Sequence, residues 1–168
     1  MRENKTKIYI DSSNIILSSL DIGFEIDFEK LFIYLKDRFR TEEIFYFTPN
    51  LKKIAQEIET LKIIGYKIVL KEIYYENNKT KGNCDVEISH YITKHIENNE
   101  VDTLVLLSGD GDFSFLIDYA LNKNISVYLM PSNLKSSSKI LRIKKKSKIV
   151  FLDSLRSLIE KEKTPTNT

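Results

Sequence analysis

Six short runs of β-branched and aromatic residues alternate along the chain with segments that carry apolar residues at helical spacing. The six runs are residues 7–10, 44–47, 67–70, 103–107, 125–130 and 148–152. Each run is almost continuously apolar, which is typical of strands that are buried on both faces. Such strands, alternating with amphipathic helices, favour an α/β fold with a mainly parallel central sheet of about five or six strands.

Four segments between these runs each present one apolar face of a helix. The residues on these faces are Phe28, Leu31, Phe32, Leu35 and Phe39; Leu51, Ile54, Ala55, Ile58 and Leu61; Ile88, Tyr91, Ile92, His95 and Ile96; and Phe113, Leu116, Ile117, Ala120 and Leu121. Asn50 is placed to cap the second helix, and His95 is expected to be a packed core histidine. No linker is long enough to divide the chain, so we expect one domain over residues 1–162 and a flexible tail over residues 163–168.

Composition excludes several classes of protein. The 26 Lys and Arg residues nearly balance the 24 Asp and Glu residues, so the net charge of +2 does not by itself indicate a nucleic-acid binder. The single cysteine, Cys84, excludes a disulfide framework and a cysteine-based zinc finger. The chain has no apolar stretch of about 18 residues and no signal-peptide pattern. We therefore expect no membrane span and a cytoplasmic location.

Three aspartates follow two of the expected strands. Asp11 comes directly after the first strand, and Asp110 and Asp112 follow the strand at 103–107 through the turn Ser108-Gly109. In open α/β sheets, ligands bind outside the carboxyl ends of the strands, where the strand order reverses. If these two strands are neighbours at that point, the three carboxylates converge at one edge of the sheet.

A fourth carboxylate, that of Asp85, belongs to the start of a helix. Asp85 precedes Ile88 by three residues and Ile92 by seven, so it shares their inward face. Carboxylates packed together repel one another, and a hard divalent cation relieves this repulsion. Oxygen ligands favour Mg²⁺ or Mn²⁺ over zinc, and such a site can activate water and neutralise charge that develops on a phosphodiester.

Each of these aspartates, taken alone, is more often a helix cap or a turn residue than a ligand, and Asp-Gly-Asp after Ser-Gly is good turn chemistry. Four aspartates at mutually compatible positions favour a site. The sequence therefore predicts a carboxylate-bound metal centre built from Asp11, Asp85, Asp110 and Asp112.

Three blocks of sequence carry these aspartates: IYIDSSNI at 8–15, KGNCDVEI at 81–88 and SGDGDFSFLIDYA at 108–120. In order and spacing, and with weaker similarity at 149–155, they resemble the NYN-domain family of PIN-like ribonucleases over nearly the whole chain. The resemblance implies a Rossmann-like, three-layer sandwich and Mg²⁺- or Mn²⁺-dependent cleavage of RNA. Motif by motif, it implies that Asp11, Asp85, Asp110 and Asp112 are the catalytic and metal-binding residues.

The same blocks contain three candidate substrate-binding residues. Asn14 would position water or a phosphate, and Ser108 matches a motif position without a defined role. Lys81 would hold a phosphate or pair with a carboxylate, although a solvated loop lysine is equally compatible with the sequence.

A basic segment near the end of the chain is a further candidate RNA contact. Its cations are Lys139, Arg142, Lys144, Lys145, Lys146 and Lys148. Clustered cations can bind phosphates, with Lys144, Lys145 and Lys146 as the expected substrate contacts, or can protect a solvated edge strand. Tyr74 and Tyr75 could stack on a base of single-stranded RNA, but their apolar neighbours favour packing.

Three alternatives remain open from the sequence. The first is a non-catalytic RNA-binding or scaffold module, which the intact set of repelling carboxylates disfavours. The second is a phosphatase with an aspartate nucleophile after the first strand, but Asp11-Ser12-Ser13 lacks the Asp-x-Asp pattern usual for that chemistry. The third is a DNA nuclease, because the same metal chemistry cleaves both nucleic acids. The expected partner is RNA in single-stranded form, and a homodimer is left open.

Overall fold

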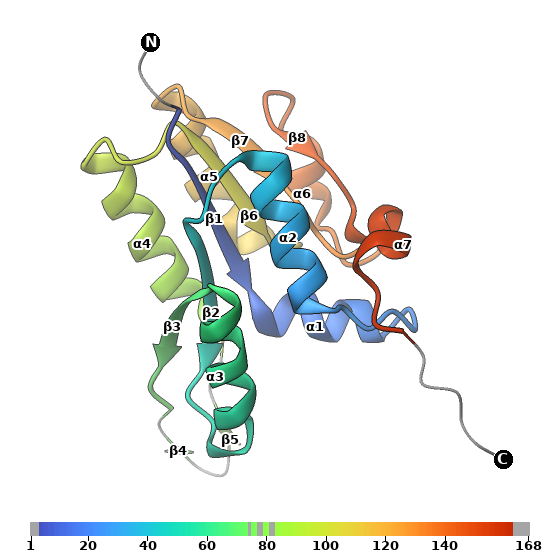
Figure 1. The fold of residues 1–168 in the computed structure, drawn as a ribbon. Coiled ribbons are helices and arrows are strands. Elements are labelled where there is room, and N and C mark those ends of the chain that lie inside the picture. Colours follow the sequence, from blue (N-terminus) through green and yellow to red (C-terminus); the bar gives the residue numbers. More distant parts are fainter. Residues whose placement is uncertain (1–3, 74, 77–78, 81–82, 163–168) are drawn as a thin grey trace, which may run out of the picture.

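The computed structural model describes residues 4–73, 75–76, 79–80 and 83–162, so the predicted tail at 163–168 lies outside the described residues. Its central sheet has six strands in the order β3-β2-β1-β6-β7-β8 (Figure 1). All five neighbouring pairs in this sheet are parallel. The strands are β1 (Thr6–Asp11), β2 (Ile44–Pro49), β3 (Lys67–Lys71), β6 (Thr103–Leu107), β7 (Ser126–Leu129) and β8 (Lys148–Ile149). The predicted parallel α/β sheet is confirmed.

Helices cover both faces of this sheet. The longer helices are α1 (Ser12–Leu20), α2 (Phe28–Phe39), α3 (Ala55–Ile64), α4 (Asp85–Glu97) and α5 (Ser114–Asn122). Shorter ones are η1 (Lys52–Ile54), η2 (Gly111–Phe113), α6 (Lys139–Arg142), η3 (Leu152–Leu155) and α7 (Arg156–Ile159), and β4 (Tyr75–Glu76) pairs with β5 (Lys79–Thr80) in a separate antiparallel ribbon. One core cluster contains residues of α1, α2, α3 and α7, and a second contains residues of α4, α5 and α6. The fold is therefore a three-layer sandwich, as predicted.

The alternation of side chains along β1 divides its residues between the two core clusters. Ile8 and Ile10 belong to the cluster under α2, whereas Tyr9 belongs to the cluster under α4 and α5. All three are fully buried. Because successive strand residues point to opposite faces, a strand with apolar residues at every position must be covered on both sides.

Three local features differ from the sequence-based expectations. Asn50 does not cap the second predicted helix: Leu51 is the N-cap of η1, and the Asn50 amide donates to Glu72 Oε1 at 3.2 Å. The last strand was expected to reach residue 152, but its ladder ends at Ile149. Helix α1 was not predicted, because serines occupy two of its buried positions.

The position of β1 in the sheet decides where the site forms. From β1 the chain builds β2 and β3 on one side, and β6, β7 and β8 on the other, so the strand order reverses between β1 and β6. Ile10 pairs with Leu107 in the β1–β6 register, which places the carboxyl ends of these two strands side by side. This is the adjacency on which the predicted convergence of carboxylates depends.

The second core cluster contains a buried polar pair. The hydroxyl of Tyr9 and Nδ1 of His95 lie 2.7 Å apart, and His95 is buried, as expected from its place on the apolar face of α4. Burial and the nearby Lys7 lower the pKa of His95, although Glu100, at 3.8 Å, opposes this shift. Because the unfolded chain then binds the histidine proton more readily, the folded state loses stability as pH falls through the ordinary range of histidine.

We expect His95→Asn, whose side-chain oxygen can still accept a hydrogen bond from Tyr9, to remove this acid sensitivity. Between pH 8 and pH 5.5, the free energy of unfolding in urea should fall more for the wild type than for the variant. His90→Asn, an exposed position on the same helix, is the control. Parallel pH profiles of the wild type and His95→Asn would contradict the assignment.

Among the described residues, no helix combines the length and the apolar character that crossing a membrane requires.

Candidate metal centre

Three of the four predicted carboxylates meet at the carboxyl edge of the sheet. Asp85, Asp110 and Asp112 each offer one oxygen, and these oxygens lie within 4.8 Å of one another. Asp85 is the first residue of α4, while Asp110 and Asp112 belong to the turn after β6. Asp85 and Asp110 are partly buried and Asp112 is exposed, so the group is open to solvent on one side.

Asp11 lies beside this group but is not part of it. Its side chain caps α1 by accepting a hydrogen bond from the Asn14 amide at 3.3 Å, and its other oxygen accepts one from the Ser108 hydroxyl at 3.0 Å. The residue is only 4% exposed. Burial raises its pKa to about 6, with smaller contributions from Asp85 and Asp110, while the two hydrogen bonds lower the pKa. Asp11 is therefore a buried neighbour of the three grouped carboxylates.

Asn14 and Ser108 tie the two strand ends together. The Asn14 side-chain oxygen accepts a hydrogen bond from the Gly109 amide at 3.0 Å. Ser108, which is fully buried, donates to Asp11 and accepts from the Asp110 amide at 3.1 Å. Both residues thus fix the turn that carries Asp110. The third candidate substrate contact, Lys81, lies outside the described residues, as does Tyr74.

The turn itself fits closely against a serine-rich segment that follows β7. A Cβ atom on Gly109 would lie 2.2 Å from the Ser136 carbonyl oxygen, and one on Gly111 would lie 2.6 Å from the Ser138 hydroxyl. The Ser138 amide also donates to the Gly109 carbonyl at 2.9 Å. The sequence does not reveal this supporting segment, because its serines resemble a stretch of low complexity. The glycines of Ser-Gly-Asp-Gly-Asp were the signal that a backbone approaches here.

The carboxylates of the group repel one another. Burial raises the pKa of Asp85, and Asp110 and Asp112 raise it further, while Lys71 acts in the opposite direction. The Asn83 amide donates to Asp85 Oδ2 at 2.6 Å, which satisfies one of its oxygens. Carboxylate oxygens held this close are suitable ligands for a hard divalent cation such as Mg²⁺ or Mn²⁺, which would also remove the repulsion. The donor set therefore fits the metal expected from the sequence.

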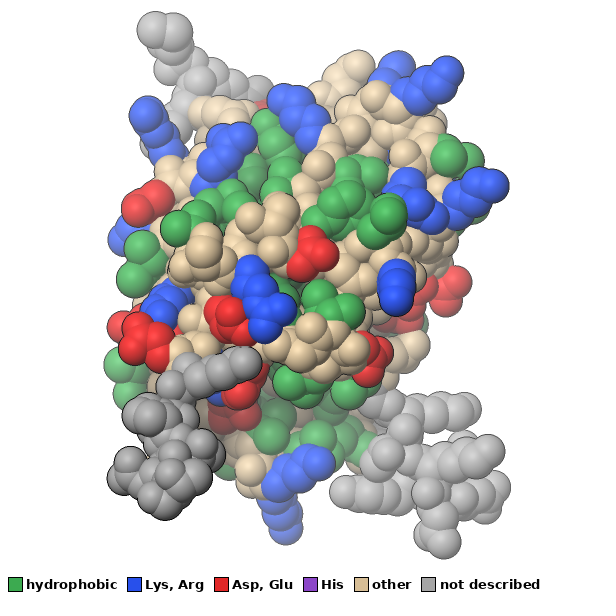
Figure 2. Space-filling view, turned by 90° about the vertical axis from the view of Figure 1, so that its right-hand side faces the viewer, with side chains coloured by type: hydrophobic (Ala, Val, Ile, Leu, Met, Phe, Trp, Pro, Cys, Tyr) green, Lys and Arg blue, Asp and Glu red, His purple; other side chains and the backbone are tan. Residues whose placement is uncertain are grey.

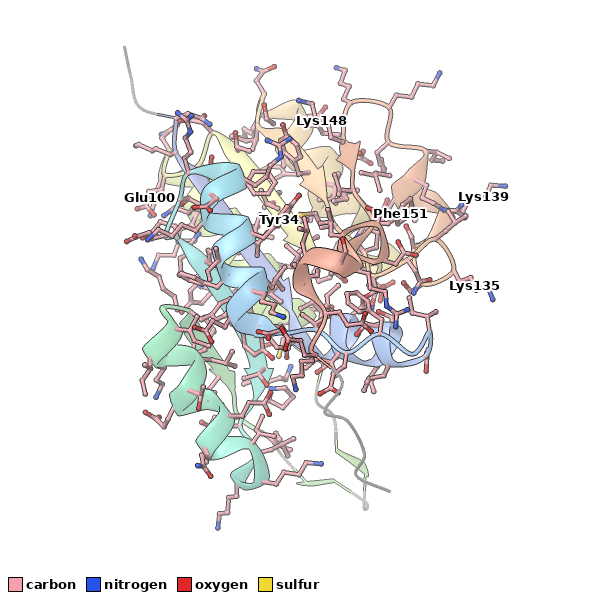
Figure 3. All side chains as sticks on the ribbon, turned by 45° about the vertical axis from the view of Figure 1, so that its right-hand side comes forward. Tyr34, Glu100, Lys135, Lys139, Lys148 and Phe151 are labelled. Carbon is pink, nitrogen blue, oxygen red and sulfur yellow. The ribbon has the colours of Figure 1, made fainter. Side chains whose placement is uncertain are left out.

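The predicted lysine contacts lie on the connection from α6 to β8. Lys144 forms an ion pair with Asp118 of α5, and Lys145 and Lys146 are exposed in the turn before β8. Because β8 runs parallel to β1 and β6, this turn precedes an amino end, whereas the carboxylates follow carboxyl ends. Figure 3 shows Lys139 of α6 well separated from Lys148. On this side of the molecule, Lys and Arg side chains gather on the upper half of the surface (Figure 2).

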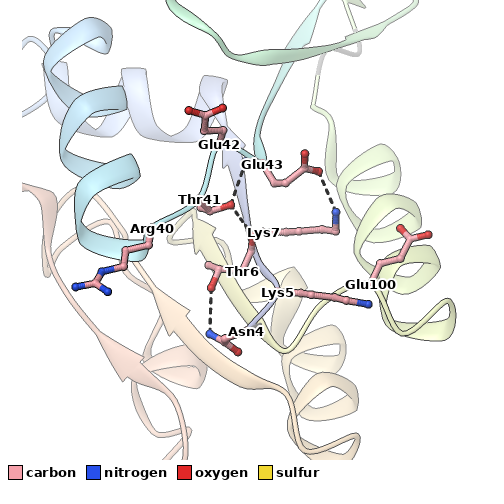
Figure 4. A pocket seen from close by; sticks show the side chains of 9 residues that line it. All are labelled: Asn4, Lys5, Thr6, Lys7, Arg40, Thr41, Glu42, Glu43 and Glu100. Atoms are coloured by element: carbon pink, nitrogen blue, oxygen red, sulfur yellow. Dashed lines mark hydrogen bonds and ion pairs between the residues drawn. The ribbon is translucent and has the colours of Figure 1, made fainter. Parts of the chain in front are cut away.

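A separate cavity of about 520 Å³ opens at the amino edge of the sheet (Figure 4). Two of the cations that line it already have partners: Lys7 pairs with Glu43 at 2.9 Å, and Lys5 donates to the Asn99 carbonyl at 2.9 Å. This cavity lies at the opposite edge from the carboxylates and does not contribute to the candidate centre.

The fold is a parallel sheet between two layers of helices, with a group of carboxylates at the point where the strand order reverses. This is the PIN-like α/β fold. The model of the NYN domain matches residues 5–153, and the chain therefore belongs to the NYN-domain family. The family resemblance and the fold predicted from the sequence are both confirmed.

Two known proteins are similar to this chain over nearly its whole length. The low amplitude and bright protein LabA of Synechococcus elongatus is 25% identical over 175 residues, covering 98% of this chain and 92% of that protein. A crystal structure of a Vibrio parahaemolyticus protein of unknown function superimposes with a TM-score of 0.74 at 22% identity. That match covers 95% of this chain and 99% of the Vibrio chain, and it establishes the shared fold.

Proposed function

We propose that the protein is a metal-dependent ribonuclease that hydrolyses phosphodiester bonds in single-stranded RNA. The observation that carries the proposal is the group of three carboxylate oxygens within 4.8 Å at the switch point of the sheet. Membership of the NYN-domain family supports the nuclease class, since this family resembles the PIN-like ribonucleases. Hydrolysis consumes one water and breaks one P–O bond, leaving a phosphate on one fragment and a hydroxyl on the other.

In this proposal Asp85, Asp110 and Asp112 hold Mg²⁺ or Mn²⁺. When bound, the cation supplies an activated water and neutralises the charge that develops on the phosphodiester. Asp11 acts through its neighbour: it accepts the Ser108 hydrogen bond, and Ser108 in turn accepts from the Asp110 amide. This chain of contacts holds Asp110 in place before metal or substrate arrives, which is the preorganisation that catalysis requires.

The geometry disfavours the phosphatase alternative. An aspartate nucleophile must approach the phosphorus atom, but Asp11 is 4% exposed and both of its carboxylate oxygens accept hydrogen bonds. The exposed side of the group is formed by Asp112 instead. A carboxylate buried behind other carboxylates is better suited to positioning than to attack.

The decisive experiment is cleavage of end-labelled RNA. The purified protein is incubated with single-stranded RNA and with DNA of the same sequence, in Mg²⁺, Mn²⁺ or EDTA. We expect cleavage of RNA that depends on the metal, and calorimetric titration should detect Mn²⁺ binding without nucleic acid. Binding of Mn²⁺ with no cleavage would favour the non-catalytic RNA-binding alternative. Equal cleavage of both nucleic acids would contradict the preference for RNA.

The lysines at 144–146 are proposed to supply affinity rather than chemistry. Replacing all three with Ala should weaken RNA binding and flatten its salt dependence, with a slope change of roughly 1 per lost phosphate contact. Turnover at saturating RNA should change much less, because uniform binding affects KM rather than the chemical step. Binding is measured across a salt series in Ca²⁺, to suppress cleavage.

A matched control removes the same charge from other elements at the same, amino, edge of the sheet. Lys36, Lys94 and Lys123 are exposed in the last turns, or at the ends, of α2, α4 and α5. Their triple Ala variant should keep the wild-type salt slope. If the two triple variants have the same slope, the lysines at 144–146 only solvate the edge of the sheet.

A further inference from the structure

Phe115 is the one exposed phenylalanine of this chain. The protein has nine phenylalanines, and the other eight are buried or partly buried, whereas Phe115 is 85% exposed. No other aromatic ring and no cation among the described residues contacts it. A single exposed apolar residue is common in soluble proteins. This one is distinguished by its place in the chain, three residues after Asp112.

Phe115 stands next to Asp112 on the outer face of one continuous helical segment. The turn η2 leads directly into α5, since both Phe113 and Ser114 have helical backbone angles. Residues three apart on a helix are neighbours, so the Phe115 ring follows Asp112 by one turn. The inward positions are taken by Phe113, Leu116 and Ile117, which are buried in the core. Phe115 is therefore exposed one helical turn after Asp112, the exposed member of the carboxylate group.

Helix α6 packs against the turn η2, and the residue that follows its C-cap, Lys144, reaches α5. A Cβ atom on Gly111 would lie 3.2 Å from Ile140 Cγ2, and Lys144 pairs with Asp118 one turn beyond Phe115. Helix α6 also carries Lys139 and Arg142, which are exposed and form no ion pair with a described residue. Phe115 therefore lies just after a turn, η2, that carries Asp112 and packs against the helix with these two cations.

We propose that Phe115 stacks on a base of the single-stranded RNA whose backbone crosses the carboxylates. This inference rests on the proposed function and names how its substrate is held. Aromatic side chains beside cationic grooves bind single strands because every base has a face on which to stack, and a duplex does not offer that face. Lys139 and Arg142 contact the phosphates next to the stacked base.

The test compares Phe115→Ala, Phe115→Leu and Phe115→Trp in binding to a labelled single-stranded RNA, in Ca²⁺ to suppress cleavage. Losing one stacked base should weaken binding by roughly 5- to 150-fold in the Ala variant. The Leu variant should be similarly weak, because it keeps an apolar side chain without a ring, and the Trp variant should bind like the wild type. Ile63→Ala, at an 86% exposed position of α3, is the matched control for loss of exposed apolar surface.

Stacking also has a spectroscopic signature. In a series of RNAs that each carry one 2-aminopurine, at successive positions, the fluorescence should be quenched at one position by the wild type and by Phe115→Trp. Phe115→Leu should not quench it. Wild-type binding and quenching in the Leu variant would overturn the role of Phe115, even in a protein that cleaves RNA. Conversely, a wild type that does not cleave but shows ring-dependent quenching would overturn the proposed catalysis and leave Phe115 as the base-binding residue.

Discussion

Asp110→Asn is expected to lower metal-dependent RNA cleavage by roughly 1000-fold or more. The carboxylate of Asp110 is one of three that would hold the cation. Such an ion stabilises the charge of the transition state by several kcal/mol, and each 1.36 kcal/mol changes the rate by a factor of ten. The local fold should persist, because the Asp112 amide donates a hydrogen bond to Asp110 Oδ1 at 2.9 Å and the asparagine oxygen can accept the same bond. Single-turnover cleavage in Mn²⁺ measures the loss.

The same variant should be more stable than the wild type when no metal is present. Asp110 raises the pKa of Asp85, which means that the two carboxylates repel each other in the folded state. Removing one charge should stabilise the fold by about 1 kcal/mol, which corresponds to a rise in Tm of roughly 2–4 °C in EDTA. Asp37→Asn, at an exposed position of α2, controls for loss of any acidic side chain. Wild-type turnover in Asp110→Asn would mean that the metal site is assigned wrongly.

The sheet and its carboxylate edge follow from local patterns in the sequence. Residues 44–47 and 104–107 are apolar at every position because both faces of β2 and β6 are covered by helices. Parallel strands of one sheet all end at the same edge. Asp110 lies in the turn that follows β6 and is therefore at the carboxyl edge. Both features follow from the periodicity of apolar residues and from the order of the elements along the chain, and both of these can be read from the sequence.

The division of roles among the aspartates could not be predicted in this way. Asp11 and Asp110 both follow strands, but Ser108, which lies 97 residues from Asp11 in the sequence, donates to the Asp11 carboxylate. That contact and the burial of Asp11 depend on which strands are neighbours and on how closely α1 packs. Local sequence could place four carboxylates at one edge but could not separate the buried Asp11 from the three whose oxygens lie within 4.8 Å of one another.

Polar segments account for the remaining differences. Helix α1 has buried Ser12 and Ser19, so its apolar periodicity is weak. The serines at 132 and 136–138 resemble a loop of low complexity, but Ser132 and Ser137 are buried and Ser136 packs against the Gly109 turn. Small side chains let this segment approach the turn, where the Ser138 backbone amide donates to the Gly109 carbonyl, and the Ser132 hydroxyl donates to the Ile15 carbonyl of α1. Such long-range contacts leave no periodic signal in the sequence.

Gly109→Ala tests that contact, and we expect it to destabilise the protein by about 3 kcal/mol. Gly109 does not have a positive φ, so the cost is steric rather than conformational. The new Cβ would lie 2.2 Å from the Ser136 carbonyl oxygen and 2.9 Å from its carbon, and these backbone atoms cannot move aside by a rotamer change. The serine segment and the turn must separate, which breaks the hydrogen bond from the Ser138 amide to the Gly109 carbonyl.

Gly111→Ala is the matched control within the same turn. There the closest atom is the Ser138 hydroxyl oxygen, at 2.6 Å, which a side-chain rotation can displace, so the expected loss is about 1 kcal/mol or less. Urea unfolding of both variants measures the difference. Gly109→Ala should also lose cleavage at temperatures where it remains folded, because Gly109 donates its amide to Asn14 and precedes Asp110. Equal stability of the two variants would show that the serine segment yields freely and does not hold the carboxylate turn in place.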